Sequence, residues 1–296
     1  MMLLAAMLAA PVMAADLPLV DEKCQEVAQG GPPADYSEQA QADFLLNYTS
    51  LYITSSPLHG VVPAQPGHGY VGVQLNGVPP LGCAHRLVLG YTKTEDTNKT
   101  PVVPKLTVLY TLPKVAGFVP YASLTYLPPI PLLGTRNVIV GGEVGAGKTL
   151  DSGLQIGARY HHTMQKTVGE IAEPFVVGDP VYLDLYVGST FGFDLMAGWH
   201  SEKVSPYLAV GYLDVTTFFL IGDDDYVGNN YSPYAGPEAA VGVQGHLKQH
   251  IGWDLEFYTA PKNFNTADLA ALDGESAPGS APARIFTGRA RIAYTF

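Results

Sequence analysis

The last fourteen residues of this chain, ARIFTGRARIAYTF, constrain its fold more than any other segment. Successive side chains point to opposite faces of a β-strand. One face of a strand here would carry Phe286, Gly288, Ala290, Ile292, Tyr294 and Phe296, and the other Thr287, Arg289, Arg291, Ala293 and Thr295. In a soluble sandwich the cationic face would meet water. In a transmembrane barrel it would meet the lumen, and the apolar face would meet lipid.

The same alternation recurs along the chain, with little helical periodicity after about residue 60. The candidate strands are 84–93, 104–112, 117–127, 137–147, 153–163, 187–200, 203–216, 235–248, 249–259 and 283–296, with 69–76 and 44–54 as further candidates. The count is therefore about twelve, with ten as the alternative, since bacterial single-chain barrels have even strand numbers. Short connections alternate with long ones, which is the barrel arrangement with the short turns in the periplasm.

An aromatic last residue on such a strand is typical of bacterial outer-membrane β-barrel proteins, and the chain resembles that class. The resemblance implies an all-β fold, a transmembrane antiparallel barrel in the outer membrane of a Gram-negative bacterium. Its partners would be outer-membrane lipid and the barrel-assembly machinery. The membrane-insertion signature would be formed by Phe286, Ile292, Tyr294 and Phe296. No named subfamily is implied.

Upstream of the barrel, the sequence divides into two parts. Residues 1–15 form an apolar run that ends in small residues, as in a secretory signal peptide, although no Lys or Arg precedes the run. Residues 16–43 are polar and contain Pro and Gly, which predicts a short irregular periplasmic lead or a plug, followed by a barrel over 44–296. Cys24 and Cys83 fit one disulfide in an oxidising compartment, with two free thiols as the alternative. Such a bridge would tether the lead to the periplasmic rim.

Composition and motifs argue against nucleic acid, nucleotide, metal and cofactor binding. The formal net charge is −11, whereas nucleic-acid binding requires basic surface. Residues 142–149, GEVGAGKT, match a phosphate-binding loop, but that loop requires a helix to begin at Lys148. A strand pattern follows instead, so a hairpin turn with small inward residues is expected. His246 and His250 have helical spacing but lie across a predicted turn.

The inward face of the predicted barrel is the candidate functional surface. It collects Glu143, Arg159, His161, Asp194, Glu238, His246, Asp254, Glu256, Arg289 and Arg291. In a narrow barrel these side chains would form a paired network that fills the lumen, and in a wider one they would line a water path and set charge selectivity.

The sequence therefore favours a passive channel or transporter for small solutes, including apolar ones, and not an enzyme. A structural or adhesive barrel is the alternative. A lipid-modifying enzyme comes third, with His200-Ser201 as its candidate pair. A soluble β-sandwich is the alternative fold.

Overall fold

The computed structural model describes the chain from residue 22 to residue 296 with gaps. The described residues are 22–32, 34, 45, 48–52, 58–88, 90–95, 101–132, 135–169, 172–174, 183–221, 225–228, 235–248, 250–260 and 285–296. The predicted signal peptide lies outside them. Among the described residues, no helix is both long enough and apolar enough to cross a bilayer.

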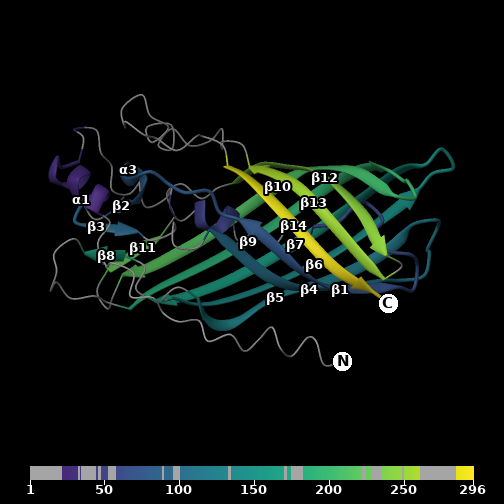
Figure 1. The fold of residues 1–296 in the computed structure, drawn as a ribbon, viewed down its shortest axis with the longest axis horizontal. Coiled ribbons are helices and arrows are strands. Elements are labelled where there is room, and N and C mark those ends of the chain that lie inside the picture. Colours follow the sequence, from purple (N-terminus) through teal and green to yellow (C-terminus); the bar gives the residue numbers. More distant parts are fainter. Residues whose placement is uncertain are drawn as a thin grey trace.

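Ten antiparallel strands close into a barrel (Figure 1). In order around the wall they are β1 (Gly69–Gly77), β4 (Val102–Thr111), β5 (Val119–Leu132), β6 (Thr135–Thr149), β7 (Leu154–Gly169), β9 (Asp184–Trp199), β10 (Val204–Ile221), β12 (Ala235–Lys248), β13 (Ile251–Ala260) and β14 (Ile285–Thr295). The last strand pairs with the first, with Tyr70 opposite Thr295, so the sheet has no free edge. Closure lets the strands satisfy backbone hydrogen bonds by pairing with one another within the wall.

The barrel has the alternative strand number of ten, not the favoured number of about twelve. The two surplus candidates are 44–54 and 84–93. Residues 48–52 are helical, and 84–93 contain most of the short helix α3 (Cys83–Arg86), all of β2 (Leu87–Val88) and the first residue of β3 (Lys93–Glu95). Both surplus segments have alternating side chains, but the described residues of neither segment pair with a strand of the wall.

The two ends of the barrel differ. The turns after β4, β6, β9 and β12 are short and lie with the C-terminus at one end, which we call the short-turn end (Figure 1). The opposite end is the long-loop end. It carries α1 (Glu22–Gln29), α3, the small sheet of β2, β3 and β8 (Ala172–Pro174), and β11 (Asp225–Gly228), which pairs antiparallel with the end of β10.

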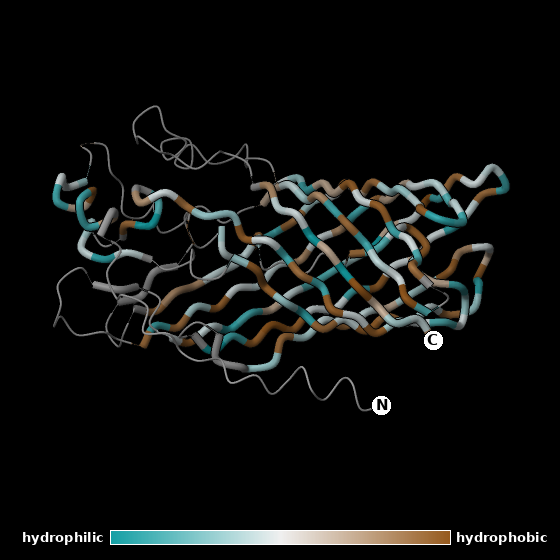
Figure 2. The backbone as a smooth tube through the Cα atoms, in the orientation of Figure 1, coloured by the Kyte–Doolittle hydropathy of each residue, from teal (hydrophilic) through white to brown (hydrophobic). Residues whose placement is uncertain are grey.

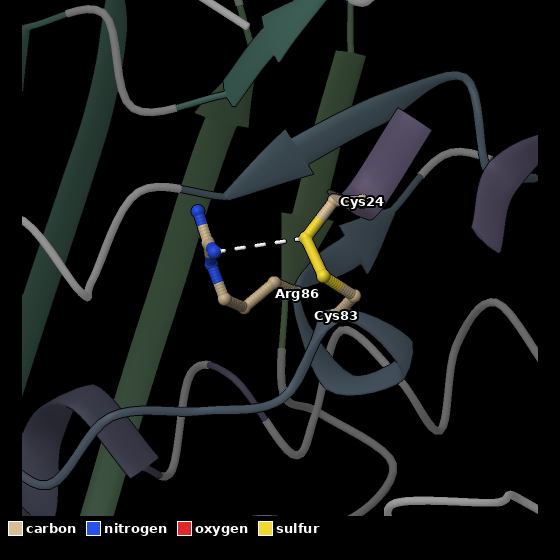
Figure 3. Close-up of a disulfide and its surroundings, with 3 residues drawn as sticks. All are labelled: Cys24, Cys83 and Arg86. Carbon is tan, nitrogen blue, oxygen red and sulfur yellow. Dashed lines mark hydrogen bonds between the residues drawn. A yellow bond between two sulfur atoms is a disulfide. The ribbon is translucent and has the colours of Figure 1, made fainter. Parts of the chain in front are cut away.

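The predicted disulfide between Cys24 and Cys83 is confirmed, with the two Cα atoms 5.0 Å apart. Arg86 Nη1 donates a hydrogen bond of 3.7 Å to Cys24 Sγ (Figure 3). The predicted position of the bridge, at the rim with the short turns, is wrong. Gly69 lies beside Phe296 at the short-turn end, so β1 leads to the long-loop end, where Cys83 follows. The prediction counted residues 84–93 as a strand between β1 and β4. Without that strand, β1 runs in the opposite direction, from the short-turn end to the long-loop end. The disulfide at Cys83 therefore lies at the long-loop end.

Alternation of side chains decides which face of each strand looks inward. Figure 2 shows hydrophobic and hydrophilic residues in turn along the strands. In β7 the burial alternates with the same period, since Gln155, Arg159 and His161 are buried while Ile156 and Tyr160 are exposed. Outward apolar and inward polar side chains are the reverse of a soluble protein and match a barrel in lipid.

Candidate functional site

A stretch of chain that precedes β1 fills part of the lumen. We call the described residues 45, 48–52 and 58–62 the lumen segment. Near the long-loop end, Ser50 Oγ lies 2.5 Å from Tyr186 Oη on β9, and Asn76 Nδ2 on β1 donates to the carbonyl of Tyr52. Near the short-turn end, the Gly60 amide donates to Gln244 Oε1 on β12 at 2.8 Å. The segment therefore runs along the lumen from the long-loop end to the short-turn end.

Val61 is fully buried and packs against three glycines on the inward face of the wall. A β-carbon at Gly147 on β6 would come within 2.1 Å of the Val61 carbonyl oxygen. A β-carbon at Gly157 on β7 or Gly198 on β9 would approach a Val61 side-chain methyl to 2.9 or 3.1 Å. The three glycines form a notch in the wall that fits the lumen segment.

The notch also explains the motif at residues 142–149. β6 continues to Thr149 and a turn leads into β7 at Leu154, so no helix follows Lys148. Gly147 makes room for Val61, and a β-carbon at Gly145 would lie 2.5 Å from Tyr121. The predicted hairpin with small inward residues is what the structure has.

A chain of ion pairs crosses the middle of the lumen. His59 Nε2 of the lumen segment lies 3.0 Å from Glu143 Oε1, and Ser123 Oγ donates to Glu143 Oε2 at 2.8 Å. Arg159 Nη1 lies 4.0 Å from the same carboxylate, and Arg159 Nε lies 2.6 Å from Asp194 Oδ2. The lumen segment is thereby joined to the charges of the wall.

A second group of charges continues from Asp194. His161 Nε2 lies 3.5 Å from Asp194 Oδ2 and 3.1 Å from Glu238 Oε1. Tyr258 Oη donates to Glu238 Oε2 at 2.9 Å. Each of the three ionisable side chains is almost fully buried. Buried charges require partners, and here each one has them.

The last two strands carry two further buried ion pairs. Asp254 lies opposite Arg291 and Glu256 opposite Arg289 in the β13–β14 register. Arg291 Nε lies 2.7 Å from Asp254 Oδ2, and Arg289 Nη1 lies 3.3 Å from Glu256 Oε1. The guanidinium group of Arg291 also lies 3.7 Å from the ring centre of Tyr70, and that of Arg289 lies 3.7 Å from the ring centre of Tyr258. These pairs fill the lumen beside β1 and β14.

Nine of the ten side chains expected on the lumen face are buried inside the barrel. They are Glu143, Arg159, His161, Asp194, Glu238, Asp254, Glu256, Arg289 and Arg291. His246 is the exception, because β12 carries it to the short-turn end, where it is exposed next to a register shift. His246 therefore does not lie among the buried side chains of the lumen, where it was predicted. Of the two alternatives for the lumen, the paired network is the one present.

The outer wall is apolar over the same strands. Leu124, Leu195 and Ile292 are exposed by 57–67%. Exposed aromatic residues border this surface. Tyr160, Phe193 and Tyr212 are in register across β7, β9 and β10, and Trp199, Tyr294 and Phe296 lie near the short-turn end. An apolar band between aromatic girdles, around a polar interior, is the pattern of a barrel in lipid.

The chain therefore has the architecture of a transmembrane β-barrel, with an apolar outer wall around a polar interior. Phe286, Ile292, Tyr294 and Phe296, which the resemblance marked as the insertion signature, all face outward on this barrel.

Among the comparisons with known proteins, only the one with solved structures finds matches. No family model matches the chain, and no curated protein matches it. The translocator domain of the autotransporter NalP from Neisseria meningitidis is 8% identical, with a TM-score of 0.49, over 87% of this chain and 96% of that one. The Pseudomonas putida toluene transporter TodX is 10% identical, with a TM-score of 0.36, over 90% and 74%. OmpT, an outer membrane protein of Vibrio cholerae, is 11% identical, with a TM-score of 0.30, over 92% and 73%. The assignment of this barrel to the membrane rests on its own two faces.

The pair proposed from sequence for catalysis, His200-Ser201, lies in the exposed short turn between β9 and β10. The Ser201 amide donates to Ser205 Oγ at 3.1 Å. Sequence inspection missed another pair, because its members lie on different strands of the barrel. His162 Nε2 and Ser189 Oγ are 2.9 Å apart on the outer face of β7 and β9.

Sequence inspection also missed the lumen segment. The side-chain pattern of residues 44–54 predicts a strand. Only the contacts of His59, Gly60 and Val61 with distant strands show that the segment lies inside the barrel. The glycines at 147, 157 and 198 were the available signal, because they share the inward parity of three neighbouring strands.

Proposed function

We propose that this protein is a transport barrel for small polar solutes and that the lumen segment holds it closed. The observation that supports this proposal is that a piece of chain separate from the wall occupies part of the lumen. A polypeptide plug can move as a unit while the hydrogen-bonded wall stays intact. A lumen filled by strand side chains alone would offer no such element.

Polar side chains line the wall around the plug, which supports a polar solute. The inward hydroxyl and amide side chains include Gln74, Asn76, Thr107, Ser123, Thr125, Thr163, Gln165, Thr167, Thr190, Thr217 and Thr287, all of them buried. Pore linings of this kind replace water around a polar solute, whereas apolar solutes favour apolar walls. This lining argues against the apolar solutes that the sequence left open.

The contacts between plug and wall are individually modest. Asn76, Tyr186 and Gln244 each make a hydrogen bond to the segment, and such bonds contribute about 0.5–1.5 kcal/mol each. The pair between His59 and Glu143 adds a charge-assisted contact. A few contacts of this size are compatible with a segment that leaves its seat during transport. The short-turn end, by the rule for such barrels, faces the periplasm.

A reversible covalent lock tests the proposal. A β-carbon at Gly188 would lie 2.8 Å from Ser50 Oγ, so the double variant Ser50→Cys/Gly188→Cys places two thiols side by side. Conductance in a planar bilayer should be absent when this variant is oxidised and appear as discrete steps after reduction. The wild type under the same reductant is the control, since it loses only the Cys24–Cys83 bridge.

Equal conductance of the locked and reduced variants would show that the segment is not the gate. Absence of current in the wild type, in the reduced variant and in His59→Ala would overturn transport and favour the structural or adhesive barrel.

The proposal assigns no catalytic step to the barrel. Lipase or deacylase activity of the purified protein that disappears in Ser201→Ala or in Ser189→Ala would contradict it.

A further inference from the structure

Three potential metal ligands converge from three strands inside the barrel. His161 comes from β7, Asp194 from β9 and Glu238 from β12, and one ligand atom of each lies within 4.8 Å of the others. Nε2 of His161 is 3.1 Å from Glu238 Oε1 and 3.5 Å from Asp194 Oδ2. Ligands about 2.0–2.2 Å from a zinc ion in tetrahedral geometry are roughly 3–3.5 Å apart. The spacing therefore suits one small ion.

Two inward glycines leave the space that these side chains share. Gly211 lies between Asp194 and Glu238 in the register of β9, β10 and β12. A β-carbon there would come within 2.1 Å of Asp194 Oδ1. A β-carbon at Gly192 would come within 2.5 Å of His161 Nε2 and 2.6 Å of Glu238 Oε1. Any larger residue at either position would close the gap where the three groups meet.

Neighbouring side chains orient the two carboxylates. Tyr258 Oη donates to Glu238 Oε2, which leaves Oε1 turned toward His161. Arg159 Nε donates to Asp194 Oδ2 at 2.6 Å, the same oxygen that faces His161, while Oδ1 is directed toward Gly211. Carboxylates that bind metals are commonly hydrogen-bonded by such neighbours, which fix the ligand before the ion arrives.

We propose that His161, Asp194 and Glu238 form a binding site for a divalent transition-metal ion, with Zn²⁺ as the ion that fits best. One imidazole nitrogen and two carboxylate oxygens are ligands that zinc accepts. The ion takes the place of the proton that the imidazole shares with the carboxylates, so binding releases a proton. The bound ion links β7, β9 and β12 across the lumen. The inference does not depend on transport.

Titration of the full-length protein tests the site. The protein is refolded into detergent micelles and freed of metal with a chelator, and then Zn²⁺ binding is followed by calorimetry and by metal content after gel filtration. One ion per chain is expected. His161→Ala should weaken binding at least about 100-fold. His162→Ala is the matched control, because the neighbouring imidazole lies on the outer face and should leave binding unchanged.

Two further variants guard against loss of folding. Glu238→Gln keeps the size and polarity of the side chain and should also abolish tight binding. Tyr258→Phe removes only the supporting hydroxyl and should weaken binding about 10–100-fold. Each variant is first shown to run as a folded, heat-modifiable band. No stoichiometric binding in the wild type, or unchanged binding in folded His161→Ala and Glu238→Gln, would overturn the proposal and leave the cluster as a proton-held ion pair.

Discussion

The carbonyl oxygen of Val61 lies so close to Gly147 that a β-carbon at position 147 would approach it to 2.1 Å. This contact fits the lumen segment to the wall. It gives a steric reason for a glycine near the end of β6, since glycine otherwise weakens a strand.

Gly147→Ala is expected to destabilise the protein by about 1–3 kcal/mol or to displace Val61, because the added methyl overpacks a full site. Denaturant unfolding in detergent measures the loss, and protease cleavage within residues 50–62 reports displacement. Gly142→Ala is the control on the same strand, since a β-carbon there would meet its nearest neighbours at 3.9 Å. Equal effects of the two changes would argue that Val61 does not occupy the notch.

Arginine on the lipid-facing wall should prevent assembly. Leu255 and Ile292 are 53% and 63% exposed on the outer face of β13 and β14. Leu255→Arg or Ile292→Arg should cost about 2–4 kcal/mol near the bilayer midplane. The measurement is the yield of heat-modifiable protein after refolding into lipid.

The control for that experiment is Val27→Arg on α1, where the side chain is 44% exposed but lies off the barrel. Normal refolding of both wall variants would count heavily against the orientation of the outer face.

Removal of one member of a buried ion pair should be costly. Arg291→Ala leaves Asp254 without its partner and is expected to lower the free energy of unfolding by about 3–5 kcal/mol. The double variant Asp254→Asn/Arg291→Gln should recover much of that loss, because no uncompensated charge remains. A double-mutant cycle by denaturant unfolding checks the coupling, and additive effects would indicate that the two side chains do not interact.

The disulfide is expected to stabilise the region around α1 but not the folded barrel. The bridge joins residues 59 apart in sequence and no strand of the wall. Loss of such a loop constraint costs about 2–4 kcal/mol, and here that cost falls on the region around α1 and α3. Cys24→Ser/Cys83→Ser should keep its heat-modifiable barrel while proteolysis near residues 22–32 becomes faster. A barrel that no longer folds would show that the bridge supports the wall as well.

The strands of the wall could be predicted because each carries an alternating pattern that needs no distant partner. The inward set followed from the same parity, which is why Asp254 and Arg291 could be placed on one face. The strand count could not be settled this way. Residues 48–52 and 84–88 also alternate, yet the contacts that make them helical or irregular come from β1, β9, β14 and Cys24.

The clusters around His59 and His161 could not be predicted from the sequence for another reason, because they form only when the barrel closes. Glu143 and His59 are 84 positions apart, and Glu238 and His161 are 77 apart. Which inward side chains meet depends on strand order, register and the position of the lumen segment. None of these three can be inferred from the alternation of side chains along a single strand.

The lumen segment has a consequence for the sidedness of the chain. Besides the ten described strands, the lumen segment has contacts near the long-loop end and, further along the chain, near the short-turn end before β1 begins. The ten strands and this segment together make an odd number of passages, which brings α1 and Phe296 to opposite ends of the barrel. If the short turns face the periplasm, as proposed, α1 and its disulfide are expected at the cell surface. An antibody against α1 would then label intact cells, whereas an epitope at Phe296 would stay hidden until the envelope is opened.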